Sequence, residues 1–273
     1  MQQKNSIVIY HRVDFDGLFS SAIVEKFINE CSDYVGYDLF GYTYGDEIPD
    51  PLMWLERGYN SIIMVDISFP TEVMLKYRDL CLSDQAEVIW IDHHVTAIDD
   101  SFKNGYSDLP GLRGLDVAAC EYSWMFFYPK TQIPSIIQYL SAYDTWNKMR
   151  FDWSGAVFPI QLALKAKYGL NQESISKDFS NNLVYMNSDQ FYNIVESGKL
   201  ICKYLERTWK AAVKTYSFEI QVAGKFRGIA IMSTEFSSNT FNSVIEDYDV
   251  CCVVNRRGPN QYSCSLYVEP GKD

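Results

Sequence analysis

The chain of 273 residues contains only three histidines and lacks the sequence features of several common protein classes. No apolar run reaches the roughly 20 residues that a transmembrane helix needs, so we expect no membrane span. The polar N-terminus enters a strand-like run at once, so we expect no signal peptide. Seven cysteines without a CxxC pair argue against a disulfide framework and against a zinc ribbon. These absences together predict a cytoplasmic protein.

Positive charge is also scarce. The 24 lysines and arginines are outnumbered by 35 acidic residues, which gives a net charge of −11. Proteins that bind long duplex DNA usually present a basic face, so this balance disfavours non-specific binding to polymeric nucleic acid. A small anionic substrate held by metal ions and a few basic side chains remains compatible. Arg256 and Arg257 could contact phosphate, or they could equally be solvated loop charges.

What the chain does contain is a regular alternation of apolar runs and amphipathic segments. The runs at 7–10, 62–65 and 88–91 are almost entirely apolar, as expected for strands whose two faces are both covered by helices. Helical spacing follows the first run over 18–28. Strand–helix–strand repetition predicts an α/β fold, with a doubly wound, mostly parallel sheet and helices on both faces.

The pattern changes in the last third of the chain. We predict a first domain over 1–190, a linker helix over 191–215 and a smaller α+β domain over 216–273. Within these, a helix over 72–80 with Thr71 as its N-cap and a helix over 238–246 are predicted from apolar spacing.

All three histidines lie beside aspartates at the ends of predicted strands. The run at 62–65 ends in Asp66, and the histidines belong to His11-Arg12-Val13-Asp14-Phe15-Asp16-Gly17 and to Asp92-His93-His94. Ligands bind beyond the carboxyl ends of the strands in open parallel sheets, so these three segments can converge. Imidazole and carboxylate are ligands that Mn²⁺ accepts. The arrangement therefore indicates a metal site.

Each cluster also has a structural interpretation. Asp16 could simply cap the following helix, and Asp66 could be a turn residue. A hydrogen-bonded pair could explain His93 and His94, although two adjacent imidazoles after a buried strand are hard to explain by packing. Because three separate segments converge, we favour the metal site.

Six side chains are candidate metal ligands: His11, Asp14, Asp16, Asp66, His93 and Asp144. They are too many for one catalytic zinc ion with three protein ligands. They suit two metal ions roughly 3.5–4 Å apart with a bridging carboxylate, the arrangement used for in-line phosphoryl displacement. The expected cofactor is a pair of divalent ions such as Mn²⁺, for which Mg²⁺ or Co²⁺ could substitute.

Over residues 6–146 the order of these motifs resembles the four-motif signature of the DHH phosphoesterase superfamily. The superfamily includes phosphatases of nano-RNA and of phosphoadenosine phosphate, exopolyphosphatases, RecJ-type exonucleases and manganese pyrophosphatases. The resemblance implies that His11 and Asp14 bind the first Mn²⁺ and that Asp66 bridges the two ions. It implies that the second ion is bound by Asp16, His93 and Asp144.

The resemblance implies further roles outside the ligand set. His94 would contact the scissile phosphate as an acid or electrostatic stabiliser, and Asp92 would orient an imidazole. Residues 216–273 resemble the DHH-associated domain, which holds the rest of the substrate and to which Arg256 and Arg257 belong. In the family a glycine-rich segment with a histidine usually follows. Here the sequence runs to Pro270-Gly271-Lys272-Asp273, so we expect that segment to be absent.

Three functions are compatible with these motifs. The first is a manganese-dependent phosphoesterase, in which a metal-bridging hydroxide attacks a small phosphorylated substrate in line. That substrate would be a short RNA or DNA oligonucleotide or a nucleotide bisphosphate. The second is an exopolyphosphatase or pyrophosphatase, although pyrophosphatases typically place one more residue between the first His and the first Asp. The third is a nucleotide-binding module that keeps its metals without turnover. A homodimer is a possible assembly.

Overall fold

The computed structural model divides the chain into two compact units, Met1–Lys199 and Leu200–Asp273. It describes residues 3–232 and 238–268. The C-terminal residues 270–273, on which the expected absence of a glycine-rich segment rests, lie outside these ranges. Within them, no helix is long and apolar enough to cross a membrane.

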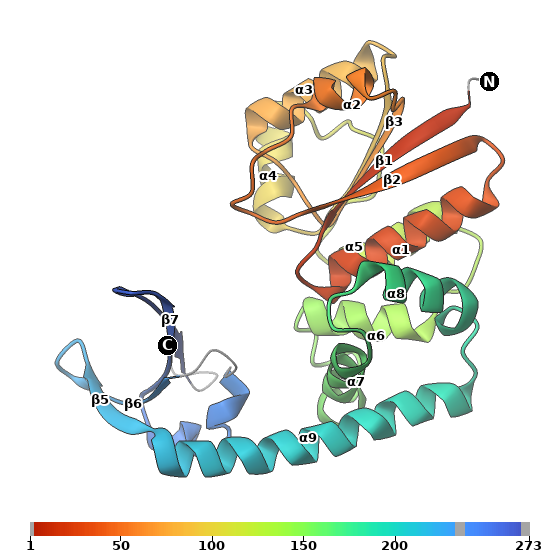
Figure 1. Cartoon of the computed structure of the whole chain (residues 1–273). Coiled ribbons are helices and arrows are strands. Elements are labelled where there is room, and N and C mark those ends of the chain that lie inside the picture. Colours follow the sequence, from red (N-terminus) through yellow and green to blue (C-terminus); the bar gives the residue numbers. More distant parts are fainter. Residues whose placement is uncertain (1–2, 233–237, 269–273) are drawn as a thin grey trace. The chain divides into compact units, whose positions relative to one another are not determined.

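A four-stranded parallel sheet forms the centre of the first unit (Figure 1). Its strands are β1 (Lys4–His11), β2 (Tyr34–Tyr42), β3 (Ser61–Val65) and β4 (Glu87–Ile91). Their spatial order is β2-β1-β3-β4, and every pair of neighbours is parallel. Because β2 lies on one side of β1 and β3 on the other, the strand order reverses between β1 and β3. The predicted parallel α/β sheet is confirmed.

Side chains of the central strands alternate between two hydrophobic cores, one on each face of the sheet. Ile7 and Ile9 of β1 belong to one core, and Val8 and Tyr10 belong to the other. The first core is covered by α2 (Pro51–Glu56), α3 (Thr71–Leu82) and α4 (Val95–Asn104). The second is covered by α1 (Phe15–Glu30), α5 (Ala119–Phe127), α6 (Ser135–Asp144), α7 (Phe158–Tyr168) and α8 (Gln172–Asp178). Burial on both faces explains why these strands are continuously apolar.

The remaining helices of the first unit include two short π-helical turns, Trp153–Val157 and Phe179–Leu183. A long helix is present where the linker helix was predicted: α9 (Ser188–Tyr216) continues across the division between the units. The separate functions predicted for the two parts of the chain stay predictions.

The second unit contains a mixed sheet in the order β5-β6-β7-β8. Its strands are β5 (Phe218–Val222), β6 (Phe226–Met232), β7 (Val250–Gly258) and β8 (Gln261–Tyr267). Only the central pair, β6 and β7, is parallel. The helix predicted over 238–246 was wrong, because two short 3₁₀ helices, Ser238–Phe241 and Ile245–Asp247, occupy this region. Its Ser, Asn and Thr side chains favour turns over a continuous helix.

Candidate metal centre

The strand ends of the first unit bring the candidate ligands to one edge of the sheet. His11 is the last residue of β1, Asp66 follows β3 directly, and Asp92, His93 and His94 follow β4. Parallel strands place their carboxyl ends at the same edge, and the strand order reverses between β1 and β3 at this point. Such a switch point is where open α/β sheets bind ligands.

The turn from β1 into α1 positions Asp14. This aspartate is the N-cap of α1, and its carboxylate accepts a hydrogen bond of 3.0 Å from the N–H of Gly17. A side chain is excluded at Gly17, because a Cβ there would lie 2.0 Å from the carbonyl oxygen of His11. The absence of a Cβ therefore lets the start of α1 pack directly against the end of β1.

Asp16 is held by the main chain of α5. Its two carboxylate oxygens accept hydrogen bonds from the N–H groups of Ala119 at 3.0 Å and Cys120 at 2.7 Å. A helix N-terminus offers such unpaired N–H groups and favours negative charge. Asp16 is thus not the cap of its own helix, which was its structural alternative, because Asp14 has that role.

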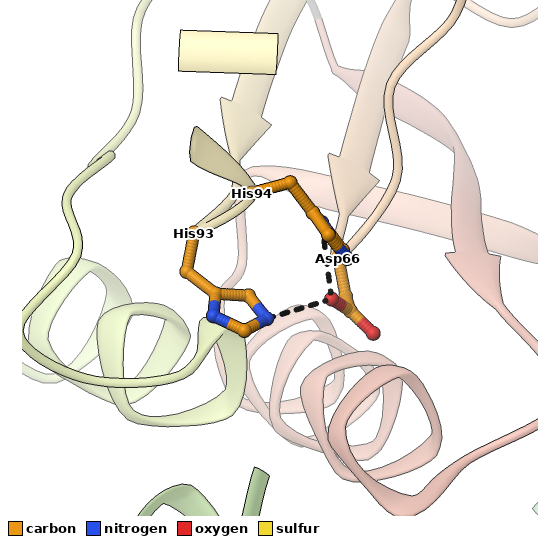
Figure 2. A group of neighbouring side chains, drawn as sticks. All are labelled: Asp66, His93 and His94. Carbon is orange, nitrogen blue, oxygen red and sulfur yellow. Dashed lines mark ion pairs between the residues drawn. The ribbon is translucent and has the colours of Figure 1, made fainter. Parts of the chain in front are cut away.

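Asp66 lies between the other candidate ligands. Among the described residues, three groups have candidate ligand atoms within 4.8 Å of one another: Asp66, His93 and His94; His11, Asp14 and Asp66; and Asp16, His93 and Asp144. Figure 2 shows the first group, with both imidazoles directed at the Asp66 carboxylate. Asp66 and His93 each belong to two of these groups, so the three groups form one continuous cluster.

The two oxygens of Asp66 face different partners. Oδ1 lies 3.5 Å from Nε2 of His93 and 3.8 Å from Nδ1 of His94. Oδ2 lies 3.6 Å from Nδ1 of His11. A carboxylate can bridge two ions by presenting one oxygen to each, and the two oxygens of Asp66 would allow this because they face different side chains.

The backbone of Asp66 is unusual. Its φ of 56° lies in the left-handed region, which is sterically unfavourable for most side chains but is tolerated comparatively well by aspartate. The N–H donates a hydrogen bond of 2.9 Å to the carbonyl of Ile91, so the turn is tied to the end of β4. Strained backbone of this kind is concentrated at functional sites.

His93 connects Asp66 to the more distant ligands. Its Nε2 lies 3.4 Å from Asp16 Oδ2 and 3.2 Å from Asp144 Oδ2. Burial acts to lower the pKa of His93, but the carboxylates of Asp144 and Asp66 outweigh it and raise this pKa to about 11. For His11, burial is likewise outweighed by Asp14 and Asp66, which raise its pKa to about 10. In both cases a positive charge is strongly favoured at the imidazole.

The aspartates show the complementary effect. Burial raises the pKa of Asp16, and the nearby carboxylates of Asp66 and Asp144 raise it further. Burial is also the largest cause of the raised pKa of Asp66. Several acids so close together in a buried place repel one another unless a cation lies between them.

Two buried polar atoms provide a test of whether the residues fit metal ions. Oδ1 of Asp66 has no hydrogen-bond partner among the described residues. Nδ1 of His11 lies 2.8 Å from Asp14 Oδ2 but is not aligned for a hydrogen bond with it. Buried polar atoms without partners are costly, and divalent cations would satisfy both. The imidazole and carboxylate donors therefore fit divalent ions such as Mn²⁺.

Asp92 and His94 form a separate hydrogen-bonded unit. Oδ1 of the fully buried Asp92 accepts hydrogen bonds from the N–H groups of His93 at 2.7 Å and His94 at 3.2 Å. The same oxygen lies 2.7 Å from Nδ1 of His94, and this contact is the largest cause of the raised pKa of His94. Asp92 thus orients the His94 ring and occupies Nδ1, which leaves Nε2 for another partner.

One residue at this edge was not predicted from the sequence. Tyr44 follows β2, and its ring centroid lies 5.7 Å from that of His11 and 6.5 Å from that of His94. The ring is 53% exposed, so it borders the cluster on the solvent side. Its position beyond the carboxyl end of a strand is the signal that could have identified it.

Arg256 and Arg257 belong to β7 of the second unit and are exposed. Nε of Arg256 donates to the carbonyl of Gly258 at 3.1 Å, and Nε of Arg257 donates to Oγ of Ser263 at 3.0 Å. Both guanidinium groups therefore have local partners, and their role in substrate binding stays a prediction.

No family model matches this chain, and no curated protein is similar to it in sequence. Among solved structures, a DHH-domain protein described as a member of a family of ribosomal proteins is similar to it with a TM-score of 0.55. The sequence identity is 14%, and the match covers 96% of this chain and 74% of that chain. The chain has the fold of a DHH domain. This confirms the fold that the four motifs predicted, whereas a nano-RNA subfamily is not identified by it.

A second structure, exonuclease RecJ bound to manganese, matches with a TM-score of 0.39 and 14% identity over 92% of this chain and 76% of that chain. This similarity is too low to equate the two folds. A shared DHH fold does not by itself assign an activity, which has to be argued from the residues of the site.

Proposed function

We propose that this DHH-fold chain is a phosphoesterase that uses two divalent metal ions, with Mn²⁺ as the preferred ion. Its substrates would be small phosphorylated compounds, namely short oligonucleotides or nucleotide bisphosphates. The observation that carries the proposal is the division of the Asp66 carboxylate between two sets of partners, His93 and His94 at Oδ1 and His11 at Oδ2. A dinuclear site has a known use in phosphoryl displacement.

The ligand sets follow from these contacts. His11, Asp14 and Oδ2 of Asp66 would hold one ion. The other ion would be held by Oδ1 of Asp66 together with Asp16, His93 and Asp144. Such ions supply positive charge for the phosphoryl group and activate water as a nucleophile.

His94 is the side chain that we propose acts on the substrate itself. Asp92 holds the proton of the imidazole at Nδ1 and favours the positively charged ring, as the raised pKa of His94 indicates. Its side chain is 38% exposed, and Nε2 is the ring nitrogen that we propose contacts a bound phosphate. We assign His94 the donation of a hydrogen bond or a proton to a phosphate oxygen, and we assign Asp92 the positioning of His94.

The charge of the chain supports a small substrate. With a net charge of −11, the protein repels long polyanions in general, and attraction has to come from the ions and a few basic side chains. A compact phosphoester that fits at the strand ends experiences mainly the local positive charge of the centre.

Hydrolysis assays on the full chain test the proposal. A dinucleotide, phosphoadenosine phosphate, pyrophosphate and polyphosphate are each supplied with Mn²⁺, Mg²⁺, Co²⁺ or EDTA. We expect hydrolysis of the first two with Mn²⁺ and none with EDTA. Preference for pyrophosphate or polyphosphate would replace the proposed substrate class. Nucleotide binding without any hydrolysis would overturn the enzymatic proposal in favour of a binding module.

Asp66→Asn serves as the inactive variant, and Asp84→Asn is its matched control. Asp84 has a φ of 55°, almost equal to the 56° of Asp66, but it is exposed on the loop after α3. The two substitutions are therefore chemically identical and occur in the same backbone conformation. Activity that persists in Asp66→Asn at the level of Asp84→Asn would contradict the dinuclear assignment.

A further inference from the structure

Three aromatic residues that contact one another stand close to the candidate ligand Asp144 along the chain. Trp146 follows it by two residues, so their Cα atoms are at most about 7.6 Å apart. The Trp146 ring centroid lies 5.2 Å from that of Trp153 and 6.1 Å from that of Tyr143, with interplanar angles of 20° and 26°. The Tyr143 and Trp153 rings are 9° from parallel. We call Tyr143, Trp146 and Trp153 the aromatic platform.

Trp146 is the outer member of the aromatic platform. Its side chain is 59% exposed, whereas Tyr143 and Trp153 are half-buried. An indole supported by two nearly parallel rings presents a flat apolar surface whose orientation is fixed. Nucleobases stack on surfaces of this kind, and such stacking tolerates any base.

The backbone of Trp146 has a conformation that is energetically unfavourable for a bulky side chain. Helix α6 ends in the hydrogen-bond pattern of a Schellman motif: the N–H of Trp146 donates to the carbonyl of Tyr143, and the N–H of Asn147 donates to that of Ala142. Trp146, the first residue after the C-cap Thr145, has a φ of 51°. Glycine is the usual residue at this position, and a bulky side chain there is an outlier. A backbone outlier beside a metal ligand is a reason to look for a function of the side chain.

Positive charge lies next to the same rings. Nζ of Lys148 is 5.3 Å from the ring centroid of Trp146 and 5.5 Å from that of Trp153. Lys148 is exposed, and it forms no ion pair within the part of the chain that the structure describes. The ammonium group lies over the rings, and because the lysine side chain is exposed and flexible, a stacking base can displace it toward the phosphate that the base carries.

We propose that Trp146 is a base-stacking residue, on which a nucleobase lies while the phosphate of the same nucleotide is held at the metal centre, with Lys148 contacting a neighbouring phosphate. This inference rests on the proposed function and assigns a residue of the chain to the base of its nucleotide substrates. Inorganic polyphosphate has no ring to place against Trp146 and gains nothing from it.

Binding of two probes tests this inference without relying on turnover. Adenosine monophosphate and ribose 5-phosphate share a sugar and a phosphate and differ in the base. With Mn²⁺ present, calorimetry on the full chain should show tighter binding of adenosine monophosphate. Trp146→Ala should weaken that binding by roughly 5-fold to 150-fold, the range for loss of one stacked base, and should leave ribose 5-phosphate unchanged.

Three further variants control the measurement. Trp146→Phe keeps an aromatic ring and should retain most of the binding. Trp146→Gly restores the residue preferred at this backbone position and should lose binding as Trp146→Ala does. Phe102→Ala removes another exposed aromatic ring, 73% exposed on α4, and should have no effect.

Several outcomes would overturn the inference. If Trp146→Ala lost affinity equally for both probes, the ring would only support the geometry of Asp144. The platform would have no role in base stacking if Trp146→Ala bound adenosine monophosphate as tightly as the wild type. The same would follow if the wild-type chain bound both probes equally well. Absence of binding of either probe to the wild type would lead to the same conclusion. Trp146→Ala could lose affinity only for adenosine monophosphate while the wild-type chain hydrolyses no phosphoester. That result would support the platform and reject the proposed function.

Discussion

Arg150 donates two hydrogen bonds of 2.7 Å to the two carboxylate oxygens of Glu121. The Glu121 side chain is 3% exposed and that of Arg150 is 25% exposed, so the pair is largely removed from water. Glu121 directly follows Cys120, whose N–H holds Asp16, and Arg150 lies on the segment after Asp144. The pair therefore ties the segment that anchors Asp16 to the segment that follows Asp144.

Arg150→Ala should destabilise the chain, because it leaves the buried Glu121 carboxylate without its partner. We expect a loss of about 3 kcal/mol in the free energy of unfolding, measured by urea denaturation. Replacing both residues by Met should cost less than Arg150→Ala alone. The matched control is Arg78→Ala, which breaks a similar two-bond pair with Asp108 at an exposed position and should have a much smaller effect. Equal effects at the two sites would show that burial of the pair is unimportant.

Asp66→Asn should reduce the number of bound Mn²⁺ ions and remove activity. An amide keeps the shape and the left-handed backbone of the residue, but it offers only one oxygen where the carboxylate faces two groups. Metal content by calorimetry or atomic absorption should fall by at least one ion per chain, while Asp84→Asn retains the wild-type content. Two tightly bound ions in Asp66→Asn would contradict the bridging role.

Asp92→Asn should slow the reaction without removing the metals. The change weakens the hydrogen bond that orients His94, and losses of about 10-fold to 100-fold are typical for such supporting residues. Because Asp92 raises the pKa of His94, its loss should also move the alkaline limb of the kcat–pH profile to lower pH. His94→Ala should retain both ions, lose more rate and lack this limb. An unshifted profile in Asp92→Asn would exclude His94 as the titrating group.

Metal binding should release protons. The pKa values of about 10 for His11 and about 11 for His93 mean that both imidazoles are protonated at pH 8 in the metal-free chain. Each proton has to leave before the ring nitrogen can bind an ion, so metal affinity should rise with pH, by about tenfold per pH unit for each proton released. Calorimetry of Mn²⁺ binding in two buffers of different ionisation enthalpy counts these protons. Equal heats in both buffers would contradict the protonated state.

Trp146→Gly should be more stable than Trp146→Ala. Both variants lack the indole, but only alanine retains a Cβ at a φ of 51°. The expected difference in the free energy of unfolding is about 1 kcal/mol in favour of glycine. Comparison of the two variants by thermal or urea denaturation isolates the backbone strain at this position. Equal stabilities would show that the left-handed conformation costs little here.

Much of the centre could be predicted because it depends on local rules. The apolar runs at 7–10, 62–65 and 88–91 match strands that are covered on both faces, and parallel strands end at the same edge of a sheet. That geometry is sufficient to bring His11, Asp66 and His93 to one edge without knowledge of the helices. The roles of the individual residues depend on ions and substrate and stay predictions.

The contacts that the sequence did not reveal are mainly non-local. Asp16 is held by amides more than 100 residues away along the chain, and the Arg150–Glu121 pair spans 29 residues. Local capping was also misassigned in one helix: Pro70 occupies the N-cap of α3, and the Thr71 hydroxyl instead donates to Asp100. The local pattern assigns Thr71 to the helix cap, but its hydrogen bond to the distant Asp100 determines what its hydroxyl does.

The anchoring of Asp16 by α5 has a consequence for how this part of the chain can vary. The donors are amide hydrogens, which every residue except proline carries, so exchanges of side chain at positions 119 and 120 cannot delete them. Selection there acts on the volume and the polarity of the side chain, since both positions are fully buried. Distant homologues could therefore share this anchor while having no letter in common at those two positions.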